Sequence, residues 1–310
     1  GGGGGGGSSG KGTWMTIGIP TVPRRGELDY LVTTLTTLLE DLPADPADPL
    51  YGRVKVVVMN NVPGKHSVYE RVKQRWAGDS AEARKAAAYL RFVDNPGTFP
   101  DPNPELPDPN DLNNPSNRPG HEVRKQTCDL VTLFDFAKDS ELYFFMEDDF
   151  RVCPHLIRTL HYLAGKASAV YPDWLAVRLS YGMNGVLMRT RDLNAFAGYL
   201  RKHVARLPPD LLWQEWIEGS IPEVRQATQA RRLLVYKHNL LDHIGEISSF
   251  AVRPKRPKWP GCYESMANVW SLSAGEKFNA ARCGSFDLSP CDRFSPDAPA
   301  WTKQPLSFRP

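Results

Sequence analysis

Three consecutive carboxylates, Glu147, Asp148 and Asp149, follow directly after an apolar run that begins at Leu142. Hard divalent cations such as Mn²⁺ and Mg²⁺ prefer oxygen ligands, and they commonly take one or two carboxylates while water and a diphosphate complete the coordination. A solvated turn is the alternative, but a turn does not account for the apolar residues before the triplet. The triplet therefore predicts a metal site in which Asp149 and Glu147 belong to the metal cluster, with Glu147 orienting the other two acids.

The apolar run before the triplet reads Leu-Tyr-Phe-Phe-Met. Its lack of alternation is typical of a strand that is covered on both faces. Sheets of α/β proteins bind ligands in the crevice beyond the carboxyl ends of such strands, so we expect the acids to lie there. His243, in a polar segment next to glycine, is a candidate second metal ligand. An ordinary surface or core histidine is an equally open interpretation of His243.

Other polar residues stand at the ends of the early expected strands or in the segments that follow. Donors at such positions can meet uracil or phosphate oxygens, whereas a carboxylate there can bind ribose or sugar hydroxyls. The pair Asn60-Asn61 is also compatible with a simple turn. The residues predicted to bind a nucleotide are Thr21, Arg24, Asn60, Lys125, Gln126 and Asp148.

A metal site that transfers a group from a diphosphate to an acceptor hydroxyl also needs a base, such as a carboxylate, that takes the proton of that hydroxyl. Asp210 and Glu215 are the first carboxylates after the glycine-containing segment 181–186. They lie five residues apart on one expected helix, so they do not share a face well. Glu215 is the preferred base, because a helix-start position already explains Asp210.

The composition is that of an ordinary globular protein, with 310 residues, 41% hydrophobic and 24% charged. A net charge of +3 is small for this length and does not indicate a nucleic-acid-binding protein. No window approaches 18 consecutive apolar residues, so a membrane tether is expected only from sequence outside this chain. Residues 1–12 are rich in glycine and serine and predict a flexible linker.

Apolar spacing predicts alternating strands and helices over most of the chain. The stretch 99–119 is rich in Pro, Asn and Asp and predicts a long surface loop. His243 is expected in a loop, and residues 251–310 in an irregular extension. The expected strands cover 14–19, 53–59, 90–93, 142–146, 174–180 and 233–236, and the expected helices cover 27–42, 67–90 with a break near Asp79, 121–139, 154–168, 190–204 and a stretch after Pro208.

Three of the five cysteines fall in the last 50 residues, at Cys262, Cys283 and Cys291. Their clustering favours at least one disulfide in the tail, with Cys262 and Cys283 as a candidate pair, and an oxidising compartment. Free thiols in a reducing compartment are the alternative.

Several separated motifs, in collinear order over roughly residues 14–250, resemble the N-acetylglucosaminyltransferase IV family. That family consists of Golgi enzymes of GT-A fold that add a β1,4-linked GlcNAc to N-glycan mannose, and Glu147–Asp149 stands where it has a Glu-Asp-Asp form of the DXD motif. The other similar segments are Thr16–Val22 with Arg24, Arg124–Gln126 with Asp129, Leu179–Gly185, Pro209-Asp210, and His243–Gly245 with Ser248-Ser249.

The resemblance implies an α/β fold of GT-A type, with a Rossmann-like mixed sheet flanked by helices and an irregular C-terminal tail. The implied units are a linker at 1–12, a glycosyltransferase domain at 13–250 and an extension at 251–310. The implied function is Mn²⁺- or Mg²⁺-dependent inverting transfer of a sugar, with GlcNAc expected, from a UDP-sugar to a glycan or glycoconjugate in the Golgi or another secretory lumen.

Three alternatives stay open at this point. One is a related GT-A branch that transfers GalNAc or another hexose to a lipid anchor or other glycoconjugate, although the members that extend such anchors carry membrane helices. Another is a non-catalytic relative that binds a glycan or a protein. A phosphatase or nuclease would need a two-metal cluster, and the sequence shows a single carboxylate cluster. The last 60 residues are also too few for the family's C-terminal sugar-binding module, and Gln214-Glu215 replaces an Asp-His pair.

Overall fold

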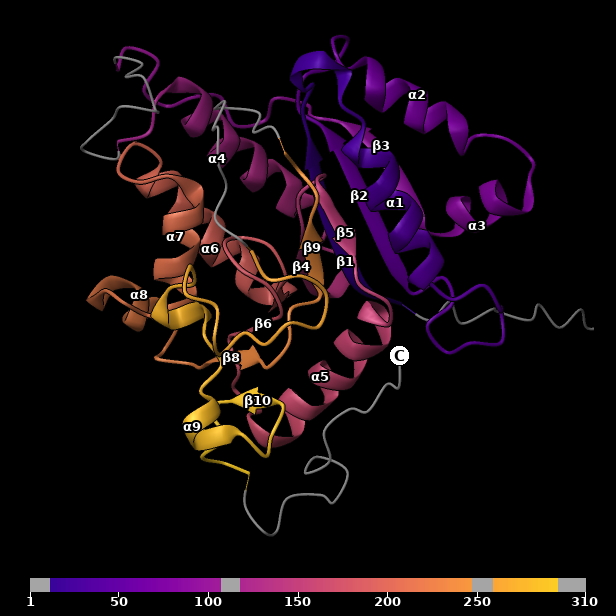
Figure 1. The fold of residues 1–310 in the computed structure, drawn as a ribbon. Helices are drawn as coiled ribbons and strands as arrows, with labels where there is room; N and C mark the ends of the chain where they lie inside the picture. Colours follow the sequence, from indigo (N-terminus) through magenta and orange to yellow (C-terminus); the bar gives the residue numbers. More distant parts are fainter. Residues whose placement is uncertain (1–11, 107–117, 247–258, 295–310) are drawn as a thin grey trace, which may run out of the picture.

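A computed structural model describes residues 12–106, 118–246 and 259–294. Within these ranges the chain forms a mixed α/β fold around an eight-stranded sheet with helices on both faces (Figure 1). Most neighbouring strands run parallel, in the order β10-β8-β6-β7-β4-β1-β2-β3. The predicted fold class is therefore confirmed.

The sheet has a purely parallel half and a mixed half. The parallel half consists of β3 (Leu90–Asp94), β2 (Val54–Asn60), β1 (Thr13–Thr21) and β4 (Ser140–Phe145). In the mixed half, β7 runs antiparallel to β4 and β6, β8 is parallel to β6, and β10 is antiparallel to β8. Its strands are β7 (Val186–Arg189), β6 (Ala176–Arg178), β8 (Leu233–Tyr236) and β10 (Leu288–Ser289).

Two hydrophobic cores lie on the two faces of the sheet. One face carries α1 (Tyr30–Asp41), α2 (Ser67–Arg75), α3 (Ala81–Tyr89) and α5 (Leu156–Val170). The other carries α4 (His121–Asp135), α6 (Thr190–His203), α7 (Pro209–Glu218) and α8 (Pro222–Ala227). None of the helices in the described ranges is long and apolar enough to cross a membrane.

Helix α1 shows how the sequence sets an element. Asp29 caps its first turn by accepting a hydrogen bond from the Val32 amide at 3.1 Å. Leu31, Leu35 and Leu38 recur at helical spacing and are all buried. The helix places Thr34 beside the end of β4, because the Thr34 hydroxyl donates to the Asp148 carbonyl at 2.8 Å.

A second, two-stranded sheet joins β5 (Phe150–Val152) to β9 (Leu241–His243), and Phe150 lies opposite His243. The expectation of a loop around His243 was therefore wrong. Each strand has only three residues, which is too short for a visible alternation of apolar and polar residues. This sheet carries His243 to the end of the acidic triplet.

The C-terminal segment 259–294 is attached to the main sheet through β10. It also contains η3 (Ala274–Glu276) and α9 (Ala280–Cys283). Disulfides join Cys153 to Cys262 and Cys283 to Cys291, so the predicted tail disulfide is confirmed, whereas the pairing of Cys262 with Cys283 was wrong. Cys128 is a buried thiol outside both disulfides. Three parts of the chain that the sequence predictions cover lie outside the described residues. They are residues 1–11 of the predicted linker, Ser248-Ser249, and residues 251–258 and 295–310 of the predicted extension.

Candidate active site

The acidic triplet lies directly after β4, at the edge of the sheet where the parallel strands end. Residue 21 of β1 pairs with residue 60 of β2 at this edge, so Thr21 and Asn60 are side by side. Asp148 and Asp149 form the turn between β4 and β5, and each is only 5% exposed. The order of the strands thus brings polar side chains from three segments to one buried edge.

Asp148 is held by three residues from the first part of the chain. The Thr21 hydroxyl donates to Asp148 Oδ2 at 2.5 Å, and the Arg24 guanidinium forms an ion pair with Asp148 Oδ1. The Thr34 hydroxyl binds the Asp148 carbonyl. His66 Nε2 lies 2.9 Å from Thr21 Oγ1 and extends this network. Both Asp148 side-chain oxygens are therefore fixed in position.

Asp149 faces the segment that contains His243. Its Oδ2 atom lies 3.2 Å from His243 Nε2 and 3.2 Å from Arg24 Nη1. The Ile244 amide donates to the Asp149 carbonyl at 3.0 Å. A Cβ atom at Gly245 would overlap Asp149 Oδ2, so only glycine leaves room at that oxygen. The His243 ring stacks on Phe150 with 4.6 Å between centroids, which sets the orientation of the imidazole.

Glu147 turns away from this pair, toward the segment between β6 and β7. The Asn184 side-chain amide donates to Glu147 Oε2 at 2.9 Å, and the Glu147 amide donates to Asn184 Oδ1 at 2.7 Å. Burial, and then the charge of Asp149, raise the pKa of the Glu147 carboxyl to about 7. Asn184 therefore holds Glu147 in place next to the acidic turn, and the assignment of Glu147 to the metal cluster stays a prediction.

Arg24 supplies the positive charge of the site. Burial acts to lower the pKa of its guanidinium, but the charges of Asp148 and Asp149 outweigh burial and raise the pKa. The Arg24 side chain is 8% exposed, and its guanidinium lies 5.3 Å from the centre of the Tyr30 ring. Burial raises the pKa of the Asp148 carboxyl, while Arg24 opposes that rise.

The residues fit a divalent cation with two protein ligands. Among the residues that the structure describes, no group of three or more His, Cys, Asp or Glu side chains converges as a complete cage. Asp149 Oδ2 and His243 Nε2 are as close as neighbouring ligands of one ion, and the missing side chain of Gly245 lets the Asp149 carboxylate take this position. Carboxylate and imidazole together suit Mn²⁺ or Mg²⁺ when water and a diphosphate fill the other positions.

A second polar network adjoins the acidic turn. The Asn61 amide donates to the Thr21 carbonyl at 3.0 Å, and the Asn60 side chain donates to Asp94 Oδ1 at 2.9 Å. Lys125 Nζ donates to the Asn61 carbonyl at 3.0 Å and to Asp129 Oδ2 at 2.7 Å. The predicted nucleotide-binding residues Asn60 and Lys125 thus belong to one network next to Thr21, and Gln126 is half-buried on α4.

The two candidate bases lie on different faces of α7. Glu215 accepts hydrogen bonds from the Tyr199 hydroxyl and from Arg206, both at 2.5 Å, and the bond from Arg206 is the main cause of the lowered pKa of its carboxyl. Asp210 belongs to the exposed residues, and loss of water around its carboxyl, and then the charge of Glu276, raise its pKa. The structure therefore brings Asp210 near Glu276 and directs Glu215 toward α6.

Three residues of the site were not anticipated from the sequence. They are His66, Thr34 and Asn184, which bind Thr21, Asp148 and Glu147 respectively. Asn184 falls in the glycine-containing segment that the sequence singled out. Thr34 occupies an ordinary position of an amphipathic helix, and His66 caps α2 by accepting from the Tyr69 amide. The pattern around Thr34 and His66 gives no signal of a functional role.

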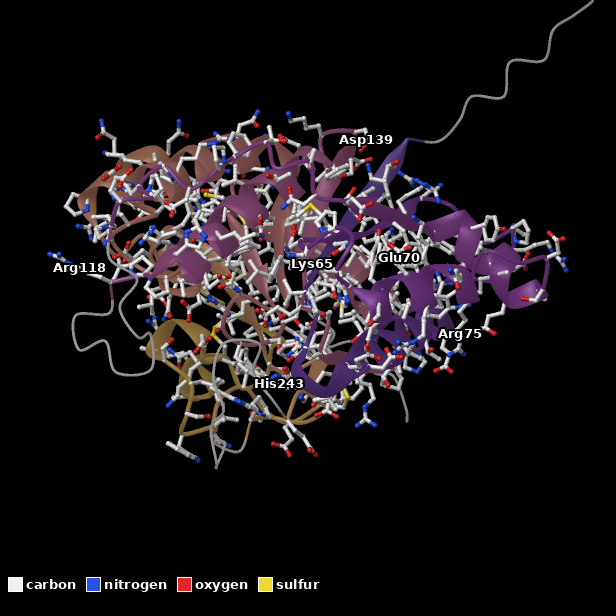
Figure 2. All side chains as sticks on the ribbon, turned by 90° about the horizontal axis from the view of Figure 1, so that it is seen from above. Lys65, Glu70, Arg75, Arg118, Asp139 and His243 are labelled. Carbon is white, nitrogen blue, oxygen red and sulfur yellow. A yellow bond between two sulfur atoms is a disulfide. The ribbon has the colours of Figure 1, made fainter. Side chains whose placement is uncertain are left out.

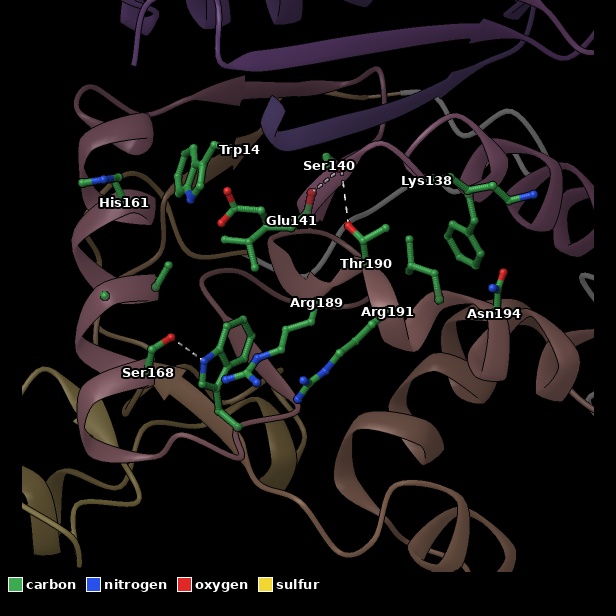
Figure 3. A pocket seen from close by; sticks show the side chains of 16 residues that line it. Trp14, Lys138, Ser140, Glu141, His161, Ser168, Arg189, Thr190, Arg191 and Asn194 are labelled. Carbon is green, nitrogen blue, oxygen red and sulfur yellow. Dashed lines mark hydrogen bonds between the residues drawn. The ribbon is translucent and has the colours of Figure 1, made fainter. Parts of the chain in front are cut away.

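A large cavity lies near the amino-terminal ends of β1 and β4, away from the acidic turn (Figure 3). It has a volume of about 840 Å³ and lies between α5 and the start of α6, with Trp14, Trp174 and Arg189 in its lining. None of the predicted site residues lines it. His243 instead lies near the surface beside the yellow C-terminal segment in Figure 2.

No protein-family model matches the sequence, and no curated protein matches it. A solved structure similar to this chain is S. aureus TarS 1-349 in complex with UDP, with 12% identity over 74% of this chain and 59% of that chain and a TM-score of 0.38. Another is glucosyl-3-phosphoglycerate synthase from Mycobacterium tuberculosis with Mn²⁺, UDP and phosphoglyceric acid, with 13% identity, 78% and 72% coverage and a TM-score of 0.39.

A third similar structure is the galactosyltransferase LgtC in complex with donor and acceptor sugar analogues, with 12% identity over 64% of this chain and 69% of that chain and a TM-score of 0.36. This chain spans less than two thirds of the TarS chain. All three likenesses are distant, and no residue role is carried over from them. The resemblance to the N-acetylglucosaminyltransferase IV family stays a prediction.

Proposed function

We propose that the protein is a metal-dependent glycosyltransferase that moves a sugar from a UDP-sugar to a hydroxyl of a glycan or glycoconjugate, with inversion at the anomeric carbon. The observation that carries the proposal is the pairing of Asp149 with His243 at the buried carboxyl edge of the sheet, beside an Asp148 fixed by Thr21 and Arg24. GlcNAc is the expected sugar, and GalNAc or another hexose is the alternative.

Each part of the site has a separate task in this proposal. Asp149 and His243 would hold a Mn²⁺ or Mg²⁺ ion, which would supply the positive charge that a leaving diphosphate needs. Arg24 places a fixed positive charge at the same edge, and Asp148 accepts hydrogen bonds from ribose or sugar hydroxyls. Lys125 and the neighbouring amides offer donors to the nucleotide. These groups are already positioned by hydrogen bonds, so the protein reorganises little when the donor binds.

The acceptor hydroxyl must lose a proton as its oxygen bonds to the anomeric carbon and the bond from that carbon to the diphosphate breaks. A base requires a free carboxylate with a pKa near or above its ordinary value. Asp210 comes closer to this requirement, because it is exposed, its Oδ1 atom accepts a hydrogen bond from the Leu211 amide and not from a charged side chain, and its pKa is raised. Glu215 is bound by Arg206 and Tyr199 and has a lowered pKa, so the geometry favours Asp210 as the base.

The expected compartment is the secretory lumen, with the Golgi as its proposed part. Two disulfides support this proposal, because such bonds persist in oxidising compartments. The resemblance to Golgi enzymes is the second support.

The central experiment measures UDP affinity and UDP-sugar hydrolysis with and without Mn²⁺ across a panel of nucleotide sugars. Asp149→Ala is expected to abolish Mn²⁺-dependent UDP binding and to lower turnover by at least about 10²-fold. Asp139→Ala is the matched control, since Asp139 is an exposed acid paired with Lys55 at the other end of β4. Wild-type protein that fails to bind UDP in Mn²⁺ contradicts the proposal, and UDP binding without turnover on any acceptor indicates a binding protein.

The base is tested with two conservative variants. Asp210→Asn is expected to lower transfer by about 10²–10⁴-fold while UDP affinity stays unchanged. Glu215→Gln loses a charged partner of Arg206, so it is expected to lower stability and to retain transfer. The reverse result, an inactive Glu215→Gln beside an active Asp210→Asn, would return the role to Glu215.

A further inference from the structure

The turn between β6 and β7, residues 181–185, contacts the acidic site at two points. Asn184 binds Glu147 through both its side-chain amide and its side-chain carbonyl. The Tyr181 ring lies 6.4 Å from the His243 ring and 5.9 Å from the Phe150 ring, between centroids. A displacement of this turn therefore moves groups that touch both the metal ligand His243 and the acid Glu147.

A buried ion pair holds the same turn from its other side. The Gly182 amide donates to Glu276 Oε1, and Arg178 Nη1 donates to the Gly182 carbonyl at 2.8 Å. Arg178 Nη1 also lies 3.5 Å from Glu276 Oε1. Both backbone polar groups of Gly182 are thus bound by one pair of opposite charges, and Gly182 has the positive φ of 61° that favours glycine.

Glu276 is itself fixed within the C-terminal segment. Its Oε2 atom accepts a hydrogen bond from the Ser273 amide at 3.0 Å, as part of a capping box at the start of η3. The same segment is anchored next to the acidic site by the disulfide between Cys262 and Cys153, which follows β5 directly. The segment therefore reaches the site by a covalent and an ionic connection.

Burial of this pair is poorly explained by stability alone. Arg178 is fully buried and Glu276 is 7% exposed, and burial lowers the pKa of the Arg178 guanidinium. Removing two charges from water costs free energy that their attraction often does not recover, so apolar residues of the same size would hold the fold equally well. What apolar residues cannot do is bind both the amide and the carbonyl of Gly182.

We propose that Arg178 and Glu276 are positioning residues that fix the turn 181–185, and through Asn184 and Tyr181 set the geometry of Glu147 and His243. The C-terminal segment 259–294 is then a working part of the donor site, connected to it through Glu276. This inference rests on the proposed function, because its main consequence is measured in UDP-sugar turnover.

The test compares three variants of the full chain. Glu276→Gln keeps the size of the side chain and removes its charge, and Asn184→Ala removes the contact to Glu147. Asp287→Asn is the matched control, because Asp287 forms another buried ion pair of the same segment, with Lys166, away from the turn. Turnover, KM for the UDP-sugar, Mn²⁺-dependent UDP affinity and the fraction folded are measured for each.

Glu276→Gln and Asn184→Ala are each expected to lower turnover about 10–100-fold per folded molecule, in addition to any loss of stability, which is the range found when a contact that orients a metal ligand is lost. The Glu276→Gln/Asn184→Ala double variant is expected to be no worse than either single variant, since both act through one turn. Asp287→Asn is expected to keep wild-type turnover per folded molecule. The Glu276→Asp variant keeps a carboxylate that can pair with Arg178, so it is expected to retain part of the wild-type turnover.

Two results overturn the inference. One is a loss of turnover in the double variant that equals the sum of the two single losses. The other is a loss of turnover per folded molecule in Glu276→Gln that is no larger than the loss in Asp287→Asn. Failure of the proposed function looks different, because the wild-type protein would then show no Mn²⁺-dependent UDP binding and no turnover. A wild-type enzyme with unaffected Glu276→Gln turnover removes only the positioning role.

Discussion

The two halves of the central sheet are built in different ways. The half made of β1, β2, β3 and β4 has parallel strands of 9, 7, 5 and 6 residues that follow one another with helices between them. The half made of β6, β7, β8 and β10 has strands of 3, 4, 4 and 2 residues and a mixed order. The strands of the first half follow from the pattern of apolar residues in neighbouring stretches of sequence. The strands of the second half are held together by contacts between residues that are far apart in the chain.

Those links are covalent and ionic. The disulfide between Cys153 and Cys262 and the buried pairs Arg178–Glu276 and Lys166–Asp287 attach the segment 259–294 to the rest of the chain, whereas the disulfide between Cys283 and Cys291 lies within that segment. No disulfide joins residues within β1–β3 and their helices, among the residues described. The comparison predicts that removal of these long-range links lowers the stability of the second half. In the first half, stability is expected to change when the polar side chains at the carboxyl ends of its strands change.

The largest expected effect comes from the disulfide between Cys153 and Cys262, which are 109 residues apart. Closing a loop of about 100 residues removes roughly 4.7 kcal/mol of entropy from the unfolded chain, and a loop of 8 residues about 2.5 kcal/mol. Cys153→Ser is therefore expected to lower the free energy of unfolding more than Cys283→Ser does. Urea titrations of both variants under oxidising conditions measure the two losses.

The Cys128→Ser variant serves as the control for these titrations, because Cys128 is a buried thiol outside both disulfides. Equal losses in Cys153→Ser and Cys283→Ser would contradict the idea that the long-range link holds the second half in place.

The second expected effect concerns the pair Lys166 and Asp287, whose side chains are fully buried and 2.5 Å apart. Asp287→Asn leaves an ammonium group in the core without its counter-charge, and breaking such a pair costs about 3–5 kcal/mol. Combining Asp287→Asn with Lys166→Met removes both charges and is expected to recover most of the loss. Thermal unfolding at pH 7 measures both variants. A double variant as unstable as Asp287→Asn would show that the charges are not the cause.

The same contrast explains what could be predicted from the sequence. Strands β1 to β4 and helices α1 to α6 were found near their true positions, because their apolar spacing is regular over many residues. Strands β6 and β8 were also found, within 174–180 and at 233–236, although they are short. Strands β5, β7, β9 and β10, with two to four residues each, were not found. The partner of Cys262 is set by tertiary structure, and nothing in the sequence points to Cys153.

The candidate site follows the same division. Thr21, Arg24 and Asp148 were expected at one edge and do lie together, because parallel strands present their ends to the same side. His243 also reaches Asp149, although through an unexpected strand. Asn184 and Glu276 could not be assigned, because their contacts depend on where a glycine turn and a distant segment meet. The chemical roles of all these residues stay predictions.

The smallest expected effect belongs to the first half and concerns His66. Its imidazole is buried beside Thr21, and the neutral ring fits best when Nε2 donates to Thr21 Oγ1 and Nδ1 accepts from the Tyr69 amide. A proton on Nδ1 would oppose that amide. Burial, and then the charge of Arg24, lower the pKa of His66 from 6.5 to about 4.

The sign of the pH effect follows from this shift. Below pH 6.5 the unfolded chain binds a proton at His66 while the folded protein does not, so stability falls as pH drops from 6.5 to about 4. One pKa unit corresponds to about 1.4 kcal/mol, which gives a total loss of about 3 kcal/mol. His66→Gln keeps a donor and an acceptor but does not titrate, so urea titrations at pH 7, 5.5 and 4 should show a smaller loss in the variant. Parallel stability curves for the two proteins would mean that His66 does not stay neutral in the folded state, and that the polar edge at Thr21 tolerates a second positive charge beside Arg24.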